Sequence, residues 1–227
     1  MNSCLTGGNL EVSALALATA GWILAVASMG QSDWRVWHLD NTTPTISSGV
    51  AWVGIWKACF YGTFVFAPQG RSAKMCHMYS LSNTFLSWDF RAVQHIFLFA
   101  CILGVMGKAF IIIALRSFYM GAARKSTTGN AFTVGGFFFS SAGICILICV
   151  IWNFHSVSKN ESITFPATFY IPPRPKTQEI GNAVIVAIIS AILMLLAGVF
   201  FLSYKFHLDS RVHPLIIDMR WTLGSET

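Results

Sequence analysis

The sequence predicts an all-α membrane protein, a four-helix transmembrane bundle that carries a small extracellular antiparallel β-sheet. Three observations support this prediction. Charged residues make up 11% of the 227 residues and hydrophobic residues 55%, whereas about a quarter of a soluble domain is charged. Four long apolar stretches alternate with loops, and the longest loop is rich in strand-forming residues. A single soluble globular domain and a disordered chain are both excluded.

The four apolar stretches are each long enough to cross a hydrocarbon core of about 30 Å. We expect one domain over residues 1–227, with spans at 12–29, 92–115, 132–152 and 180–204. The expected connections are an extracellular loop at 30–91, a cytosolic turn at 116–131, a second extracellular loop at 153–179 and a cytosolic tail at 205–227. Ala25-Val26-Ala27 resembles a signal-peptidase site, but no basic residue precedes Val12, so we expect an uncleaved helix.

Orientation depends on two sequons, because the distribution of basic residues is a weak guide here. Asn41 and Asn160 each begin an Asn-x-Ser/Thr sequence, and they fall in the two loops that must share one side of the membrane. Both sequons are therefore possible N-glycosylation sites on a lumenal face. Both termini are then expected in the cytosol.

Two of the six cysteines, Cys59 and Cys76, lie in the long loop. If that loop faces an oxidising compartment, these two cysteines have only each other as partners. A bridge closing a loop of this size contributes about 3 kcal/mol by chain entropy. The less favoured alternative, two free thiols in a cytosolic loop, would also place both sequons in the cytosol.

The long loop reads as a small antiparallel sheet. Residues 34–39 are rich in strand formers, residues 50–61 read as a second strand, and the Pro68-Gln69-Gly70 turn precedes a strand carrying Cys76 and Tyr79. So small a sheet cannot bury enough apolar surface alone. It needs the disulfide and the membrane surface below it.

Trp34, the run Gly54-Ile55-Trp56, Cys59, Cys76 and Arg91 follow the order of the claudin signature, which reads Trp, Gly-Leu-Trp, Cys, Cys, Arg. Thr168–Pro172 is similar to the tip of the second claudin loop, and Gln178–Gly181 to the opening of the fourth claudin helix. The chain thus resembles the claudin family from about residue 10 to 205, and looks most similar to the divergent claudin thirty-four type.

The resemblance implies roles for individual residues. Trp34, Gly54, Ile55, Trp56 and Arg91 would fix the sheet on the bundle, Cys59–Cys76 would pin its hairpin, Phe169 and Tyr170 would contact a neighbouring cell, and Ser80 and Leu81 would make lateral contacts. An equally weighted alternative for the aromatic pair is packing under its own loop or at the membrane interface. A small polar Ser80 would make a weak lateral contact.

The resemblance also implies a function and partners. The expected function is adhesion between cells at the tight junction of the plasma membrane, with control of paracellular passage. The expected partners are copies of itself or other claudins, in cis and in trans, and the lipid bilayer. PDZ scaffolds are doubtful, because Gly224–Thr227 lacks an apolar last residue. The alternative is an auxiliary subunit of an ion channel, a role found among related four-span proteins.

No residue pattern predicts catalysis. The six histidines lack paired ligand spacing, and we expect no enzyme, cofactor, metal site or nucleic-acid partner. Lys108 is the one charge inside the expected spans. We favour snorkelling to the cytosolic end over the alternative, a buried functional charge. The pairs Ala16/Ala20, Gly136/Ser140 and Ala187/Ala191 have a spacing that suits close helix packing.

The charges of the long loop predict a barrier whose residual leak favours anions. Bases outnumber acids there, Arg35, Lys57, Arg71, Lys74 and Arg91 against Asp33, Asp40 and Asp89.

Overall fold

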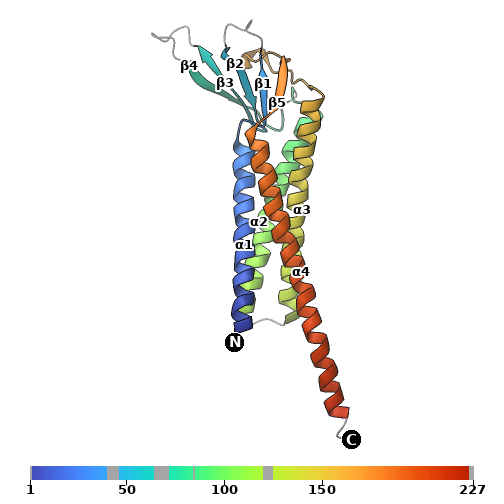
Figure 1. The fold of residues 1–227 in the computed structure, drawn as a ribbon. Coiled ribbons are helices and arrows are strands. Elements are labelled where there is room, and N and C mark those ends of the chain that lie inside the picture. Colours follow the sequence, from blue (N-terminus) through green and yellow to red (C-terminus); the bar gives the residue numbers. More distant parts are fainter. Residues whose placement is uncertain (1, 40–45, 64–71, 84, 120–124, 225–227) are drawn as a thin grey trace. The chain divides into compact units, whose positions relative to one another are not determined.

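The computed structural model describes residues 2–39, 46–63, 72–83, 85–119 and 125–224, and within these the side chains of 10–39, 49–62, 73–83, 85–117 and 129–203. The helices are α1 (Asn2–Gly30), α2 (Trp88–Tyr119), α3 (Lys125–Ser158) and α4 (Asn182–Gly224), with a 3-10 turn at Ala167–Phe169. The strands are β1 (Arg35–His38), β2 (Ile46–Val53), β3 (Lys57–Thr63), β4 (Ser72–Met78) and β5 (Thr177–Ile180), all drawn in Figure 1.

All four helices are long and apolar enough to cross a membrane, which confirms the four-span prediction. Helices α1, α2 and α3 extend beyond both ends of the apolar stretches from which they were predicted, and α4 extends beyond the C-terminal end of its stretch. As a result, α2 ends at Tyr119 and α3 begins at Lys125, so both helices enter the expected turn at 116–131. The first membrane-spanning stretch begins at Leu10 and includes a buried acid, Glu11. Lys108 is therefore not the sole charge within the spans.

The chain forms two compact units. The first, here the helical unit, comprises Met1–Trp22, Ile102–Gly143 and Ile192–Thr227. The second, here the sheet unit, comprises Ile23–Cys101 and Ile144–Ala191 and contains all five strands.

Glycines and phenylalanines pack α3 against α4 in the helical unit. A Cβ atom on Gly136 would lie 3.0 Å from the carbonyl oxygen of Gly198, so the two backbones approach closely at this point. Gly198 in turn faces Ser140, which confirms the packing expected of the Gly136/Ser140 pair. The Ala16/Ala20 pair, in contrast, is exposed on α1, so the same expectation was wrong there.

The sheet unit has the strand order β4-β3-β2-β1-β5, with every neighbouring pair antiparallel. The fifth strand comes from the second loop and pairs with β1, so that Trp37 lies opposite Gln178. We expected the fourth span to begin at Ile180. That residue instead ends β5, and the helix begins at Asn182.

The expected strand at 50–61 is two strands, β2 and β3, that turn back on each other at Gly54-Ile55-Trp56. The Gly54 N–H donates to the carbonyl of Lys57 at 2.9 Å and closes this turn. A Cβ atom at Gly54 would lie 2.8 Å from the Cα of Ser32, so the close approach requires glycine. A tight turn therefore lies inside the apolar run at 50–61 that was predicted as one strand.

One hydrophobic core lies on a single face of the sheet. Alternate residues of the strands enter it, such as Trp37 on β1 and Phe60 on β3, both almost fully buried. Residues of the second loop, including Phe165 and Ile171, belong to the same cluster. Both loops are therefore folded into one structure.

Candidate functional site

Cys59 and Cys76 form a disulfide bond between directly opposite residues of β3 and β4, as predicted. Strand alternation and register place the bond on the face of the sheet opposite the hydrophobic core. On that outer face the Trp52 ring lies 5.6 Å from the ring of Tyr61 and 5.4 Å from Lys74 Nζ. The disulfide thus stabilises the outer face of the sheet, which carries these two aromatic rings and the lysine.

Trp34 is anchored where α1 leads into the sheet. Its side chain is 2% exposed, its Nε1–H donates to the carbonyl of Ser28 at 2.9 Å, and its ring meets that of Phe97 edge-on at 5.5 Å. The indole therefore joins the end of α1 to α2. This contact supports the role expected of Trp34.

The Gly54-Ile55-Trp56 turn is also anchored. The carbonyl of Ile55 accepts a hydrogen bond of 2.7 Å from Nε2 of Gln94, a fully buried residue of α2. The carbonyl of Trp56 accepts from the N–H of Tyr79 at 3.0 Å. The turn is therefore connected both to a helix and to the end of β4.

Arg35, rather than Arg91, is the arginine buried between the sheet and the helices. Arg91 is half-buried in the first turns of α2, whereas Arg35 is 5% exposed. Arg35 Nε donates to Asn153 Oδ1 at 2.7 Å, and its guanidinium lies 5.5 Å from the ring centre of Phe90. The sequence held a signal for this, because the alternation that buries Trp37 puts residue 35 on the same face.

The buried arginine and Tyr79 influence each other. Burial lowers the pKa of Arg35 to about 10, while the fields of Tyr79 and Glu161 oppose that shift, so the guanidinium stays charged at neutral pH. Burial raises the pKa of Tyr79 well above its ordinary value, and Arg35 opposes that shift in part. The neutral Tyr79 hydroxyl donates to the carbonyl of Gly54.

The expected adhesive pair, Phe169 and Tyr170, points in two directions. The Phe169 ring lies 4.7 Å from the ring of His77 and 5.7 Å from that of Phe165, so it packs against the core. Tyr170 is 56% exposed and sits in the left-handed region with φ of 55°. Phe169 therefore packs under its own loop. Of the two residues, only Tyr170 is exposed enough to contact another molecule.

Ser80 and Leu81 lie in a turn just after β4. The turn is closed by a hydrogen bond from the Asn83 N–H to the Ser80 carbonyl at 3.2 Å, and Asn83 Oδ1 accepts from the Ser80 N–H at 2.9 Å. Ser80 is exposed and Leu81 is half-buried. Residues 80–83 thus form a turn.

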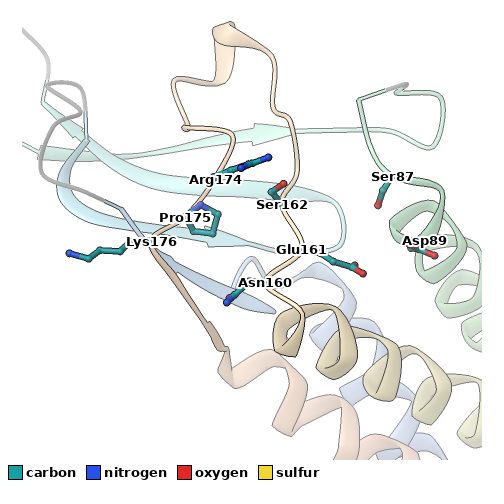
Figure 2. A pocket seen from close by; sticks show the side chains of 8 residues that line it. All are labelled: Ser87, Asp89, Asn160, Glu161, Ser162, Arg174, Pro175 and Lys176. Atoms are coloured by element: carbon teal, nitrogen blue, oxygen red, sulfur yellow. The ribbon is translucent and has the colours of Figure 1, made fainter.

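Asn160 lies just past the end of α3, exposed and in the left-handed region with φ of 50°. It lines an open polar groove of about 580 Å³, and Figure 2 shows the groove between the segment carrying Arg174 and the start of α2. The full lining is Ser87, Asp89, Asn160, Glu161, Ser162, Arg174, Pro175 and Lys176. The other sequon residue, Asn41, lies outside the described residues.

Lys108 contacts an aromatic ring in the helical unit. Its Nζ lies 3.3 Å from the ring centre of Trp22 on α1, a distance typical of a cation–π contact. Gly104 makes room for the indole, because a Cβ there would lie 2.5 Å from Trp22 Cδ1. Lys108 thus makes a cation–π contact within the helical unit, and its snorkelling stays a prediction.

Some expected features fall outside the described residues. They are the charges Asp40 and Arg71 and residues 225–227 at the C-terminus. Among the residues that the structure does describe, no group of three or more His, Cys, Asp or Glu side chains is placed to hold a metal ion.

Comparison with known proteins agrees with this architecture. Residues 19–203 match the family described as PMP-22/EMP/MP20/Claudin tight junction. Claudin-3 from Rattus norvegicus is 25% identical over 193 residues, covering 83% of this chain and 79% of the relative. Claudin-4 from Bos taurus is 25% identical over 191 residues, 83% of each chain, and Claudin-2 from Bos taurus is 26% identical over 200 residues, 84% and 76%.

The family match at residues 19–203 includes the five strands, the two bridged cysteines, the last three membrane-spanning stretches and part of the first. The chain therefore belongs to the PMP-22/EMP/MP20/Claudin tight junction family and is a divergent claudin.

Proposed function

We propose that this protein is an adhesive and barrier-forming component of tight junctions. Family membership points to a structural rather than an enzymatic role in a multi-pass membrane protein. The observation that carries the proposal is the fusion of both loops into one disulfide-pinned sheet, because a rigid platform presents contacts to a partner at low entropic cost. Its partners would be copies of itself or other claudins.

We infer that the sheet lies outside the cell and that both termini lie in the cytosol. The Cys59–Cys76 bond supports this orientation, because disulfides persist in oxidising compartments. With an even number of spans, an external sheet leaves both ends of the chain on the other side. Glycosidase-induced mobility shifts of Asn41→Gln and Asn160→Gln variants would test the side and the use of each sequon.

Tyr170 is the residue that we expect to carry contact between cells. It is 56% exposed at the tip of the second loop, while Phe169 beneath it packs on His77 and holds the tip in place. Large exposed aromatic side chains are enriched at interfaces, since they bury much area for little conformational entropy. Ser80 and Leu81 remain candidates for lateral contact, at the turn after β4.

The test is expression in cells that lack junctions. Adhesion predicts enrichment of the protein where two expressing cells meet, and loss of that enrichment in Tyr170→Ala but not in Tyr170→Phe. Thr168→Ala, an exposed change two residues away, is the matched control. Uniform surface signal together with a co-purifying channel would instead favour the auxiliary-subunit function.

A further inference from the structure

A crevice of about 540 Å³ opens in the sheet unit between the start of α2 and the end of α3. Its lining comprises two tryptophans, two isoleucines and four residues that carry charge or titrate. We propose that this crevice is a binding site for a choline phospholipid, which holds the phosphocholine headgroup at its rim and one acyl chain at its base. The proposal requires that α2 and α3 cross a membrane, but it does not depend on an adhesive function.

The residues that α3 contributes change in character along one face. Ile148 and Ile151 come first, then Trp152 and His155, at the spacing of one helical face. Lys159, the first residue after α3, continues this line, because its N–H donates to the carbonyl of His155 at 3.0 Å. From Ile148 to Lys159 the helix rises about 16 Å at 1.5 Å per residue. A phospholipid has its groups in the same order, with the acyl chain first, then the ester region and then the headgroup. The polar region of one bilayer leaflet is about 5–8 Å thick. The crevice therefore matches a lipid from chain to head.

Two tryptophans form the middle of the crevice. The Trp88 and Trp152 rings meet at 5.9 Å with an interplanar angle of 77°, and Trp88 is 67% exposed. Indole rings gather at the membrane–water interface, where one end of the ring is apolar and the other is wet. Two rings at a right angle offer faces to a quaternary ammonium group, which aromatic faces bind through cation–π attraction.

The rim carries both signs of charge. Asp89 and Glu161 lie on it with Lys159 and His155, and Figure 2 shows the Glu161 side chain pointing toward the start of α2, where Asp89 lies. Ser156 Oγ donates to Glu161 Oε2 at 2.5 Å and orients that carboxylate. Asp89 and Glu161 also line the adjoining grooves with Arg35, Arg174 and Lys176, so the rim offers both signs of charge rather than a single one. A zwitterionic headgroup fits, with its ammonium at the carboxylates and rings and its phosphate at Lys159.

The base of the crevice distinguishes a lipid from soluble phosphocholine. Ile148 and Ile151 are 43% and 66% exposed in the membrane-spanning part of α3. An acyl chain buries these side chains, whereas a free headgroup leaves them without a ligand partner. We therefore expect soluble phosphocholine to compete poorly with the phospholipid.

The experiment is native mass spectrometry of the full chain, released from micelles that contain equal amounts of phosphatidylcholine, phosphatidylethanolamine and phosphatidylglycerol. We expect phosphatidylcholine adducts to exceed each of the other two at least about threefold, the lower range of a cation–π preference. Trp88→Ala and Lys159→Glu should each lower phosphatidylcholine occupancy by about threefold or more. A millimolar excess of soluble phosphocholine should leave the adducts in place.

Matched controls separate a site from general lipid contact. Phe154→Ala removes a ring that is 57% exposed on the same helix but does not line the crevice, and Lys176→Glu changes a cation outside it. Phe154→Ala should leave the adducts unchanged, and Lys176→Glu, beside the same carboxylates, should lower them less than Lys159→Glu. Monodisperse elution with an intact disulfide shows that each variant folds. Equal occupancy by the three lipids, or an equal loss in Phe154→Ala and Trp88→Ala, would overturn the proposal.

Discussion

Arg35 and Asn153 join the first strand to the third helix through one hydrogen bond of 2.7 Å, although 118 residues separate them in sequence. Both side chains are almost fully buried, at 5% and 4% exposure. When a buried charge loses its hydrogen-bond partner, the free-energy cost of its desolvation remains and no interaction offsets it. The bond is therefore a sensitive point of the sheet unit.

Asn153→Ala should lower the free energy of unfolding by about 1.5–3 kcal/mol, the range for a hydrogen bond to a charged group. Asn153→Asp, which keeps the acceptor and adds a charge, should retain or exceed the wild-type value. Denaturant titration in detergent micelles measures both. The control is Arg91→Gln at a half-buried arginine, and an equal loss there would contradict the special position of Arg35.

Gly54→Ala should destabilise the protein by about 1–3 kcal/mol, the usual cost of overpacking. The new Cβ would meet backbone atoms of Gln31 and Ser32, which cannot move aside as a flexible side chain could. Gly30→Ala is the matched control, because no atom lies within 4 Å of the added Cβ. Thermal unfolding midpoints of the two variants check the difference, which disappears if the turn is loosely packed.

Replacing Phe169 should destabilise the protein more than replacing Tyr170, because the Phe169 ring packs inward and the Tyr170 side chain is exposed. Phe169→Ala removes a half-buried ring from contacts with His77 and Phe165 and should cost about 2 kcal/mol, less than a fully buried phenylalanine. Tyr170→Ala, at an exposed position, should change stability by less than about 0.5 kcal/mol. Scanning fluorimetry of the two variants decides, and a larger loss in Tyr170→Ala would reverse the assignment.

Tyr79 should resist ionisation for as long as the protein is folded. Burial raises its pKa above the ordinary value of about 10, so the folded state holds a proton that the unfolded state releases. The stability that follows from this difference is complete below about pH 10 and is lost as the pH rises further. Phenolate absorbance should show a late phase that coincides with unfolding and is absent in Tyr79→Phe. Early ionisation of Tyr79 in the folded protein would refute this.

Lys74 should influence which ions cross a layer of cells. It is exposed on the outer face beside Trp52, whereas the burial of Arg35 removes that charge from any pore. We expect a barrier with a slight anion preference, and Lys74→Glu should shift the dilution potential toward cations. Lys176→Glu in the second loop is the control for a general charge effect. Clear cation preference in the wild type would contradict the expectation.

The helices and the disulfide were predictable because their signals are local or compositional. A long apolar stretch specifies a span wherever it packs, and Cys59 and Cys76 were alone in the long loop. The turn at Gly54 was not recognised, because it interrupts an otherwise continuous run of strand-forming residues. What decides it is the contact with Ser32, which is a tertiary feature.

The fifth strand could not be foreseen for a similar reason. Thr177–Ile180 is four residues long and largely exposed, without the alternation that marks a half-buried strand. Its pairing with β1 crosses more than half of the chain. The inward position of Arg35, by contrast, follows from strand alternation, because residues 35 and 37 share one face of β1.

The pairing of β1 with β5 has a mechanical consequence. Strand β1 follows α1 within a few residues and β5 precedes α4 by one, and the Gly181 N–H donates to the carbonyl of Trp34 at 3.0 Å where they meet. A pull on the far end of the sheet would thus be carried along the backbones of both strands, while the hydrogen bonds between β1 and β5 keep the two strands in register. The load would therefore be shared between α1 and α4, the two helices to which these strands connect.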